Sequence, residues 1–330
     1  MAARTSRAQP IAGGRPVRLV VPYPAGGAVD LVGRLYAERM GPALAQDVVV
    51  DNRSGGAGIV GADAVAKARP DGATLGVVGM TTLCAYKALY TRLPFDPDRD
   101  FAPVSQASAG TVVCCVNPKR AREEGWTSFP RLIAWAKERP EELRFGYAGV
   151  GTTAHFMLAE LQRRTGAKVL MVTYRGGAPA VADLQAGVID MIFELTPGLT
   201  PLIESGDAVP LAVGSRERLP ALPSVPAMGD FPELGLADLD MQAWEAIVAP
   251  AGTPPEVLAR LSAAVRQAGA DATIAERMRP TGFRAETSAS PEALAEKIHR
   301  EIPFWRRLVE CRARASTDAA GGQARRSFQG

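Results

Sequence analysis

The sequence predicts a two-lobed α/β protein with a ligand cleft between its lobes. The chain has 330 residues, which corresponds to roughly two domains of about 150 residues each. Short apolar runs alternate with helical patterns, and this alternation starts at Val17 and again at Leu143. Strands separated by helices are typical of βαβ units and parallel sheets. A cleft between two such lobes is a usual place for a ligand.

The first block contains the elements of a βαβ arrangement. Apolar runs bounded by Pro, Gly or polar residues predict strands at 17–21, 48–50, 74–78 and 112–116. A helix is expected to begin near Asp30, where apolar residues recur at helical spacing. A second helix ends at Lys67, before the helix breaker Pro70-Asp71-Gly72. These helices are too few to cover both faces of the sheet.

The second block repeats this pattern. Its apolar runs predict strands at 143–147, 168–173, 188–193 and 209–213. One helix is expected after Gly151. Another begins at Pro179, because proline suits the first turn of a helix.

The last third of the chain is predicted to be helical. One helix begins at Pro254-Pro255, and a final helix places Leu294, Ile298, Ile302 and Trp305 on one face, with a kink or break at Pro303. We expect these helices to return and cover the first sheet, which makes the first lobe discontinuous. The expected division is lobe I at 15–116 plus 239–311, lobe II at 117–238, a disordered leader remnant at 1–14 and a disordered tail at 312–330.

The composition excludes several kinds of function. The net charge of +3 is too small to suggest a nucleic-acid partner or a polybasic membrane contact. Two histidines and four cysteines without a C-x-x-C pair give no expectation of a zinc site or a thioredoxin-type site. Cys114 and Cys115 lie in an apolar run and are interpreted as buried strand residues. The P-loop and G-x-S-x-G motifs are absent.

The sequence as written is expected to be soluble and to lack an export signal. No apolar run reaches the ~18 residues of a membrane span, and residues 1–14 lack the apolar region of a secretory signal. Ser6-Arg7-Ala8 nevertheless resembles the remnant of a cleavage site, so a signal that has been removed stays open.

One glycine-rich segment offers an enzymatic alternative. Gly56–Gly61 fits the pattern G-x-G-x-x-G after a strand and before a helix, as in nucleotide-dependent oxidoreductases. That fingerprint also requires an acidic residue at the end of the next strand, which here reads Gly79-Met80-Thr81-Thr82. A tight strand-to-helix turn is therefore the favoured interpretation.

Three strand-to-helix turns of one kind are the most informative feature. They are rich in Gly and small residues and lie at 22–30, 147–155 and 174–179. Exposed N–H groups and the helix dipole make a helix N-terminus a favourable place for an anion. Glycine allows the ligand to approach the backbone closely. Two such turns from different lobes could hold a carboxylate, although turns of this kind also simply connect strands to helices.

Short motifs along the chain resemble those of one receptor family. The run Arg18-Leu19-Val20-Val21-Pro22-Tyr23-Pro24-Ala25-Gly26-Gly27, followed by Asp30, is similar to the mature start of the Bug family, the extracytoplasmic solute-binding receptors of tripartite tricarboxylate transporters. Further motifs follow in the family's order: Val50-Asp51-Asn52-Arg53, Leu93-Pro94-Phe95-Asp96, Tyr174-Arg175-Gly176-Gly177-Ala178-Pro179 and Ala249-Pro250-Ala251-Gly252-Thr253-Pro254. Each motif is weak alone, but their order and spacing over residues 15–310 are specific.

The resemblance implies a type II periplasmic-binding-protein fold whose cleft closes on a small organic anion. The implied ligands are di- and tricarboxylates, acidic amino acids and aromatic carboxylates. The ligand-binding residues carried over in lobe I are Tyr23, Ala25, Gly26, Gly27 and Asp30, with Thr81 and Thr82 as a further contact. Those carried over in lobe II are Ala148, Gly149, Thr152, Thr153, His155, Arg175 and Asp190.

Two acidic residues need a separate account. A carboxylate at Asp190 would repel an anion, so this residue is expected to accept an ammonium or hydroxyl group or to orient a water. Glu194, at the cleft end of a strand, could shift specificity toward a ligand that carries positive charge.

We therefore expect a non-enzymatic receptor that captures a carboxylate by clamp closure and delivers it to a tripartite tricarboxylate transporter. The receptor is expected to be a periplasmic monomer with no cofactor, no metal and no nucleic-acid partner. Two alternatives stay open. One is a nucleotide-dependent oxidoreductase, and the other is a cytoplasmic carboxylate sensor of the same fold, if Met1 is the true start.

Overall fold

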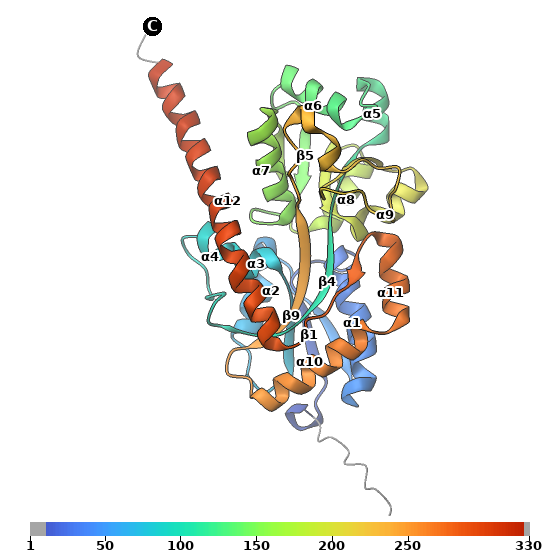
Figure 1. The fold of residues 1–330 in the computed structure, drawn as a ribbon, viewed down its shortest axis with the longest axis vertical. Coiled ribbons are helices and arrows are strands. Elements are labelled where there is room, and N and C mark those ends of the chain that lie inside the picture. The colour runs from blue at the N-terminus through green and yellow to red at the C-terminus, as the bar shows by residue number, and fades with distance from the viewer. Residues whose placement is uncertain (1–10, 327–330) are drawn as a thin grey trace, which may run out of the picture.

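The computed structural model describes residues 11–326, and the side chains of residues 11–310. These residues form two α/β lobes joined by long strands (Figure 1). Lobe I contains the N-terminal part of the chain together with the returning C-terminal helices, and lobe II contains the middle of the chain. The fold class predicted from the sequence is confirmed.

The lobe I sheet is mixed rather than purely parallel. Its order is β2-β1-β3-β9-β4, and β10 pairs with β4. β1 is parallel to β2 and β3, whereas β9 is antiparallel to both β3 and β4. The strand bounds are β1 Val17–Val21, β2 Val48–Asn52, β3 Thr74–Gly79, β4 Phe101–Val116, β9 Gln242–Pro250 and β10 Arg284–Ala285.

The lobe II sheet continues from the second half of β4. Its order is β4-β7-β5-β6, and β8 pairs with β4. β5 is parallel to β6 and β7, and β4 is antiparallel to β7 and β8. The remaining strands are β5 Arg144–Tyr147, β6 Leu170–Thr173, β7 Met191–Leu195 and β8 Val209–Val213.

The helices cover both faces of each sheet. On lobe I, α1 (Ala28–Leu44), α10 (Pro255–Gly269) and α11 (Ala272–Met278) cover one face, and α2 (Ile59–Ala66), α3 (Met80–Cys84), α4 (Tyr86–Leu89) and α12 (Pro291–Arg326) lie on the other. Lobe II carries α5 (Pro118–Glu124), α6 (Phe129–Glu138), α7 (Thr153–Thr165), α8 (Gly177–Gln185) and α9 (Thr196–Ser205). Strand β1 is buried on both faces of the sheet. Its successive side chains point to opposite faces, so that Leu19 packs toward α1 and Val20 toward α2.

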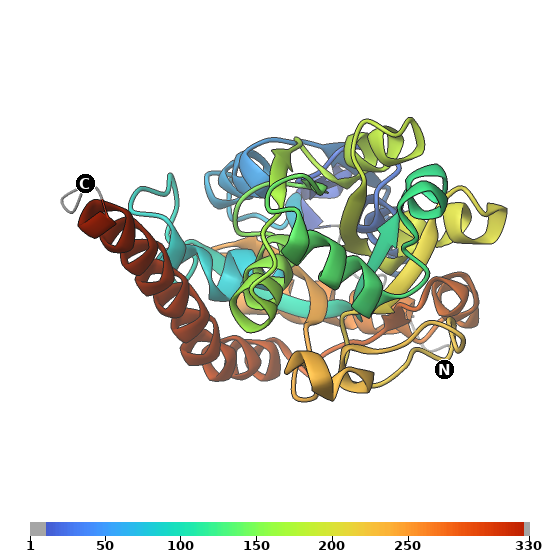
Figure 2. The same ribbon diagram turned by 90° about the horizontal axis from the view of Figure 1, so that it is seen from above.

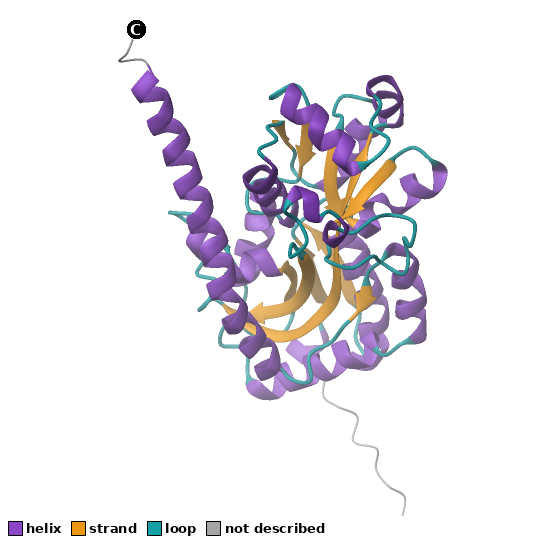
Figure 3. Ribbon diagram, turned by 45° about the horizontal axis from the view of Figure 1, so that its top comes forward, coloured by secondary structure: helices purple, strands orange, loops and turns teal. Residues whose placement is uncertain are grey.

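Strand β4 is the main physical link between the lobes. Residues 101–111 pair with β9 in lobe I, and residues 112–116 pair with β7 and β8 in lobe II. Val112 already pairs with a strand of lobe II, so the boundary between the lobes in β4 lies before Val112. The sequence analysis placed this boundary after Val116. Irregular register near Pro103 and Gln106 lets the strand curl, and both β4 and β9 are visibly curved (Figure 3).

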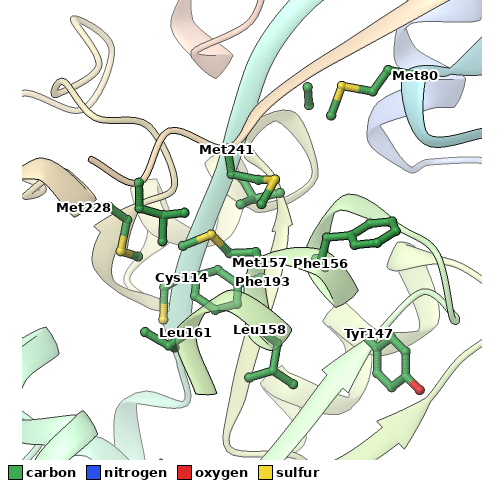
Figure 4. Close-up of a cluster of buried hydrophobic side chains, with 14 of the residues drawn as sticks. Met80, Cys114, Tyr147, Phe156, Met157, Leu158, Leu161, Phe193, Met228 and Met241 are labelled. Atoms are coloured by element: carbon green, nitrogen blue, oxygen red, sulfur yellow. The ribbon is translucent and has the colours of Figure 1, made fainter. Parts of the chain in front are cut away.

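The two adjacent cysteines of β4 pack in the hydrophobic core. Cys114 and Cys115 are fully buried and belong to hydrophobic clusters on opposite faces of the sheet. Figure 4 shows Cys114 beside Met157 and Phe193. Burial raises the pKa of both thiols. The interpretation of these residues as buried strand cysteines is confirmed.

The C-terminal helices pack on lobe I. Leu261 and Val265 of α10 are buried with α1 residues, and Leu294 of α12 is buried against the other face. Trp305 of α12 reaches lobe II, where its ring contacts Phe156 of α7 with centroids 5.1 Å apart. Helix α12 thereby fastens both lobes along one side of the molecule (Figure 2).

The two ends of the described chain differ from the predicted disorder. Ile11–Gly14 forms a short 3-10 turn in which Ile11 is buried and its N–H donates to Gln46 Oε1 at 3.0 Å. Helix α12 continues to Arg326 with Pro303 inside it, so the backbone at 312–326 is helical. The alanines and arginines of this segment favour helix. Residues 1–10 and 327–330 lie outside the described residues.

Among the described residues, no helix combines the length and the apolar composition that a membrane crossing requires.

The glycine-rich segment 56–61 has a packing function. A Cβ on Gly61 would lie 2.6 Å from Pro22 Cα and 2.9 Å from the Arg53 carbonyl oxygen, so only glycine lets α2 approach β1 this closely. The carbonyl of Ala57, in the same segment, accepts hydrogen bonds from the Tyr23 and Tyr86 hydroxyls at 3.1 and 2.6 Å. These contacts give Gly61 and Ala57 a structural role in packing this segment against its neighbours.

Replacing Gly61 with Ala should therefore destabilise the fold. We expect Gly61→Ala to lower the free energy of unfolding by about 1–3 kcal/mol, because the added methyl group overlaps backbone atoms that cannot move aside. Gly41→Ala in α1 is the control, since its Cβ meets only the Gln46 carbonyl oxygen at 3.5 Å. Urea denaturation measures both variants, and equal stability of the two would contradict the packing explanation.

Candidate functional site

A cavity of about 60 Å³ lies between the lobes. Lobe I lines it with Tyr23, the first turns of α1 and α3, and residues Trp244 and Glu245 of β9. Lobe II lines it with Ala148, the first turns of α7 and α8, and residues Glu194 and Leu195 of β7. A neighbouring hollow shares the starts of α1 and α8 with this cavity and extends to α9.

The turn between β1 and α1 is held in shape by Asp30. Its carboxylate accepts hydrogen bonds from the Gly26 N–H at 2.9 Å, from Arg34 Nε at 2.9 Å and from Asn52 Nδ2 at 2.8 Å. Burial alone would raise the pKa of Asp30, but these hydrogen bonds outweigh it and lower that pKa. The ionised side chain thus fixes the turn, while Gly27 faces the cavity.

The turn between β5 and α7 is held from behind by His155. The Gly151 N–H donates to His155 Nδ1 at 2.9 Å, and the imidazole stacks on Tyr147 with ring centroids 5.6 Å apart. Thr152 Oγ1 donates to the Gly149 carbonyl at 2.9 Å instead of capping the helix. The first turn of α7 therefore lines the cavity without a side-chain cap.

The two lobes touch around the cavity. The Tyr90 hydroxyl of lobe I donates to the Val150 carbonyl of lobe II at 2.6 Å. A Cβ on Gly149 would lie 3.0 Å from Ala57 Cβ, and one on Gly176 would lie 2.4 Å from Pro24 Cδ. Glycine at these two positions lets the opposing turns meet, and the cavity lies between the lobes beside them.

The helix starts at the cavity leave donors for a ligand. The N-cap residues of α1, α7 and α8 are Gly27, Thr152 and Gly176, and none of them caps its helix through a side-chain hydrogen bond. Of the helices that start elsewhere, α5, α6 and α11 are capped by Asn117, Ser128 and Asp271, whereas α2, α4 and α10 are also uncapped. Uncapped first turns with their positive dipole ends favour an anion at this cavity.

Two carboxyl groups also face the cavity. Glu194 and Glu245 come from lobe II and lobe I respectively. Burial raises the pKa of Glu194 to about 7. Burial, together with repulsion from Glu194, raises the pKa of Glu245 to about 8. Burial also raises the pKa of Tyr23, so this phenol stays neutral at physiological pH.

The comparisons with known proteins agree with this geometry. Residues 32–313 match the family described as "Tripartite tricarboxylate transporter family receptor". The chain belongs to this family. It is a solute-binding receptor, and its assignment to the Bug family from the sequence is confirmed.

Individual relatives cover nearly the whole receptor. The protein BugT of Bordetella pertussis is 34% identical over 296 residues, which cover 89% of this chain and 88% of BugT. The solved structure of R. palustris Rpa4515 with adipate has 30% identity and a TM-score of 0.84, covering 91% of this chain and 97% of that one. MatC from Rhodopseudomonas palustris with bound malate has 28% identity and a TM-score of 0.82, covering 89% and 99%.

The structure brings together about half of the site residues expected for the receptor. Those that line the cavity are Tyr23, Gly27, Thr81, Ala148, Thr152 and Thr153. Gly26 lines the neighbouring hollow, and Asp30, Gly149 and His155 shape the turns without lining the cavity. Ala25 and Arg175 are exposed and do not line the cavity, and Thr82 is buried in α3.

Asp190 lies away from the site. It precedes β7 and is fully buried, and its carboxylate accepts hydrogen bonds from Arg144 Nε at 2.9 Å, Arg144 Nη2 at 2.6 Å and Arg120 Nε at 3.2 Å. The cavity is at the other end of the same strand, where Glu194 and Leu195 lie. The expectation that Asp190 contacts a ligand or its water is therefore corrected: Asp190 joins β5 to β7 and α5.

The sequence interpretation missed Gly177, Ala178, Trp244 and Glu245 as residues of the cavity. Glu245 did leave a signal, because it is a single charged residue within the apolar run of β9. A carboxyl group in a strand that is otherwise buried needs a partner or a function. The same carboxyl group interrupts the apolar run, and strand β9 was not predicted.

Removing the Asp190 side chain should destabilise lobe II. We expect Asp190→Ala to lower the free energy of unfolding by about 2–3 kcal/mol, because the variant leaves two partly buried guanidinium groups without their carboxylate. Asp207→Ala is the matched control, since Asp207 is exposed in the same lobe, and its effect should stay within about 0.5 kcal/mol. An Asp190 variant as stable as the unchanged receptor in urea denaturation would contradict this assignment.

Proposed function

We propose that this receptor captures a small organic carboxylate in the cavity between its lobes and delivers it to the membrane components of a tripartite tricarboxylate transporter. The observation that carries the proposal is the convergence of uncapped helix starts from both lobes on one cavity. Helices α1 and α3 start there from lobe I, and α7 and α8 start there from lobe II. A carboxylate bound there bridges the lobes through backbone N–H groups.

The relatives support a carboxylate as the ligand. Rpa4515 and MatC carry adipate and malate in their solved structures. Both ligands are small organic carboxylates. We extend this class of ligand to the present chain, without choosing either compound.

Ligand binding favours the closed arrangement because only that arrangement offers both lobes to the ligand. The contacts of Gly149 with Ala57 and of Gly176 with Pro24 form only when the lobes meet. The closed receptor presents a surface that differs from that of the unliganded receptor, and a membrane transporter can recognise this difference.

Receptors of this family are periplasmic, and we propose the same location for this chain. We also propose that it acts as a monomer and without a cofactor or catalytic step. The titratable side chains that line the cavity within the described part of the chain are Tyr23, Glu194 and Glu245. A binding role agrees with this set better than nucleophilic or general acid–base catalysis, which also needs an activated partner group.

Calorimetry should detect carboxylate binding to the receptor. A panel of aliphatic and aromatic carboxylates is titrated into the purified protein, and at least one is expected to bind with a Kd well below about 1 mM. Amides of the same compounds serve as the control, because they keep the shape and lose the charge. If no carboxylate binds more tightly than its amide, the proposed function is wrong.

A side chain at Gly27 should block the ligand. A Cβ at Gly27 meets only the Pro24 carbonyl oxygen at 3.7 Å, and the backbone φ of −83° suits any residue. Gly27→Val should therefore fold normally and weaken carboxylate binding at least about tenfold, because valine occupies the approach to the first turn of α1. Gly41→Val, in the same helix but remote from the cavity, should keep its affinity. Equal affinities for both variants would remove Gly27 from the site.

A further inference from the structure

The carboxyl groups of Glu194 and Glu245 each lie against the start of a helix. A Cβ on Gly177, the first residue of α8, would be 2.3 Å from Glu194 Oε2. A Cβ on Gly79, the N-cap of α3, would be 3.1 Å from Glu245 Oε2. These two helix starts therefore already lie beside a carboxyl group of the receptor itself, and we assign the carboxylate of the ligand to the starts of α1 and α7.

Glu245 lacks a hydrogen-bond donor in the described part of the chain. Its side chain is 5% exposed, it lines the cavity, and its Oε2 is buried without a partner. A buried acceptor of this kind is costly unless a donor reaches it. Glu194 Oε1 accepts the Leu195 N–H at 3.0 Å. The missing donor at Glu245 is one that a ligand can supply.

The charges around the cavity disfavour a second anionic group. Among the described residues that line it, the only titratable ones are Tyr23, Glu194 and Glu245, and no lysine, arginine or histidine is present. A dicarboxylate would place its second negative charge beside two carboxyl groups in a buried space, and once these groups are ionised the like charges repel strongly. A positively charged ligand group would instead pair with them and donate hydrogen bonds.

We propose that the ligand of this receptor is a carboxylate that carries a protonated amine at its other end. The inference rests on the proposed function and adds the second recognition element. The ligand carboxylate faces the starts of α1 and α7, and its ammonium group donates to Glu245 and Glu194. The ligand is thus a zwitterion, and a dicarboxylate is a poorer match.

Matched ligand triplets test this inference by calorimetry on the unmodified receptor at pH 8. Each triplet keeps one carboxylate and changes only the far group: glutarate, 4-aminobutanoate and butanoate are one triplet, and shorter, longer and aromatic-ring analogues form the others. We expect the amine to bind at least about tenfold more tightly than the dicarboxylate in the best triplet. A dicarboxylate that binds as tightly as its amine or more tightly overturns the inference and leaves the proposed function intact. Absence of binding by every member overturns the proposed function itself.

Variants identify the groups that recognise the amine. Glu245→Gln and Glu194→Gln keep the side-chain shape, remove one charge each and should each cut the preference for the amine about tenfold or more, with little change in affinity for the carboxylate that lacks the amine. Glu233→Gln, at an exposed position outside the cavity, should keep the full preference. A preference that survives in both cavity variants overturns the inference.

The pH dependence of affinity gives an independent readout. The pKa values of Glu194 and Glu245, about 7 and about 8, mean that both groups hold protons at pH 6. Pairing with an ammonium group favours their ionised forms, so the amine should release protons on binding and bind more tightly as the pH rises from 6 to 9. Tyr23, the other titratable group at the cavity, stays neutral over this range because burial raises its pKa. Affinity for the amine that falls over this range overturns the inference.

Discussion

The continuous backbone pairing of β4 is the constraint on which the rest of the receptor depends. One strand of 16 residues is hydrogen-bonded to β9 in lobe I and to β7 and β8 in lobe II. Because the strand cannot change register without breaking both sheets, the turns at the carboxyl ends of β1, β5 and β6 are held opposite one another. The cavity is a consequence of that arrangement.

The chemistry of the cavity comes from backbone groups and from carboxyl groups, with no basic side chain among its described lining residues. Uncapped helix starts provide the donors, and the second layer of contacts keeps those starts in place. Asp30 fixes the turn before α1, and His155 fixes the turn before α7. A receptor built in this way can bind an anion while the net charge of the chain remains only +3. Specificity then depends on the few side chains that line the cavity, of which Glu194 and Glu245 are acidic.

The polar residues of the first half of β4 illustrate why part of the fold was hidden in the sequence. Ser105 and Gln106 are buried, and their hydrogen-bond partners come from a segment about 180 positions later: Ser288 N–H donates to Ser105 Oγ, and the Gln106 N–H donates to Ser288 Oγ. Because Pro103 and these polar residues interrupt the apolar pattern, only residues 112–116 were predicted as strand. Likewise Glu245 interrupts β9, so the strand that pairs with both β3 and β4 was not predicted.

The sequence by itself determined the α/β alternation, the helical character of the C-terminal part and the glycine-rich turns, because these features depend on local periodicity and on the backbone freedom of glycine. The order and spacing of its motifs also identified the family. Only the tertiary structure decided which turns share a cavity, and it removed Asp190 from the site and brought Glu245 into it. Both residues are acidic and near strand ends, and a sequence does not show which end of a strand faces the opposing lobe. That choice is made by long-range pairing through β4 and β9, whose partners lie more than 100 residues apart.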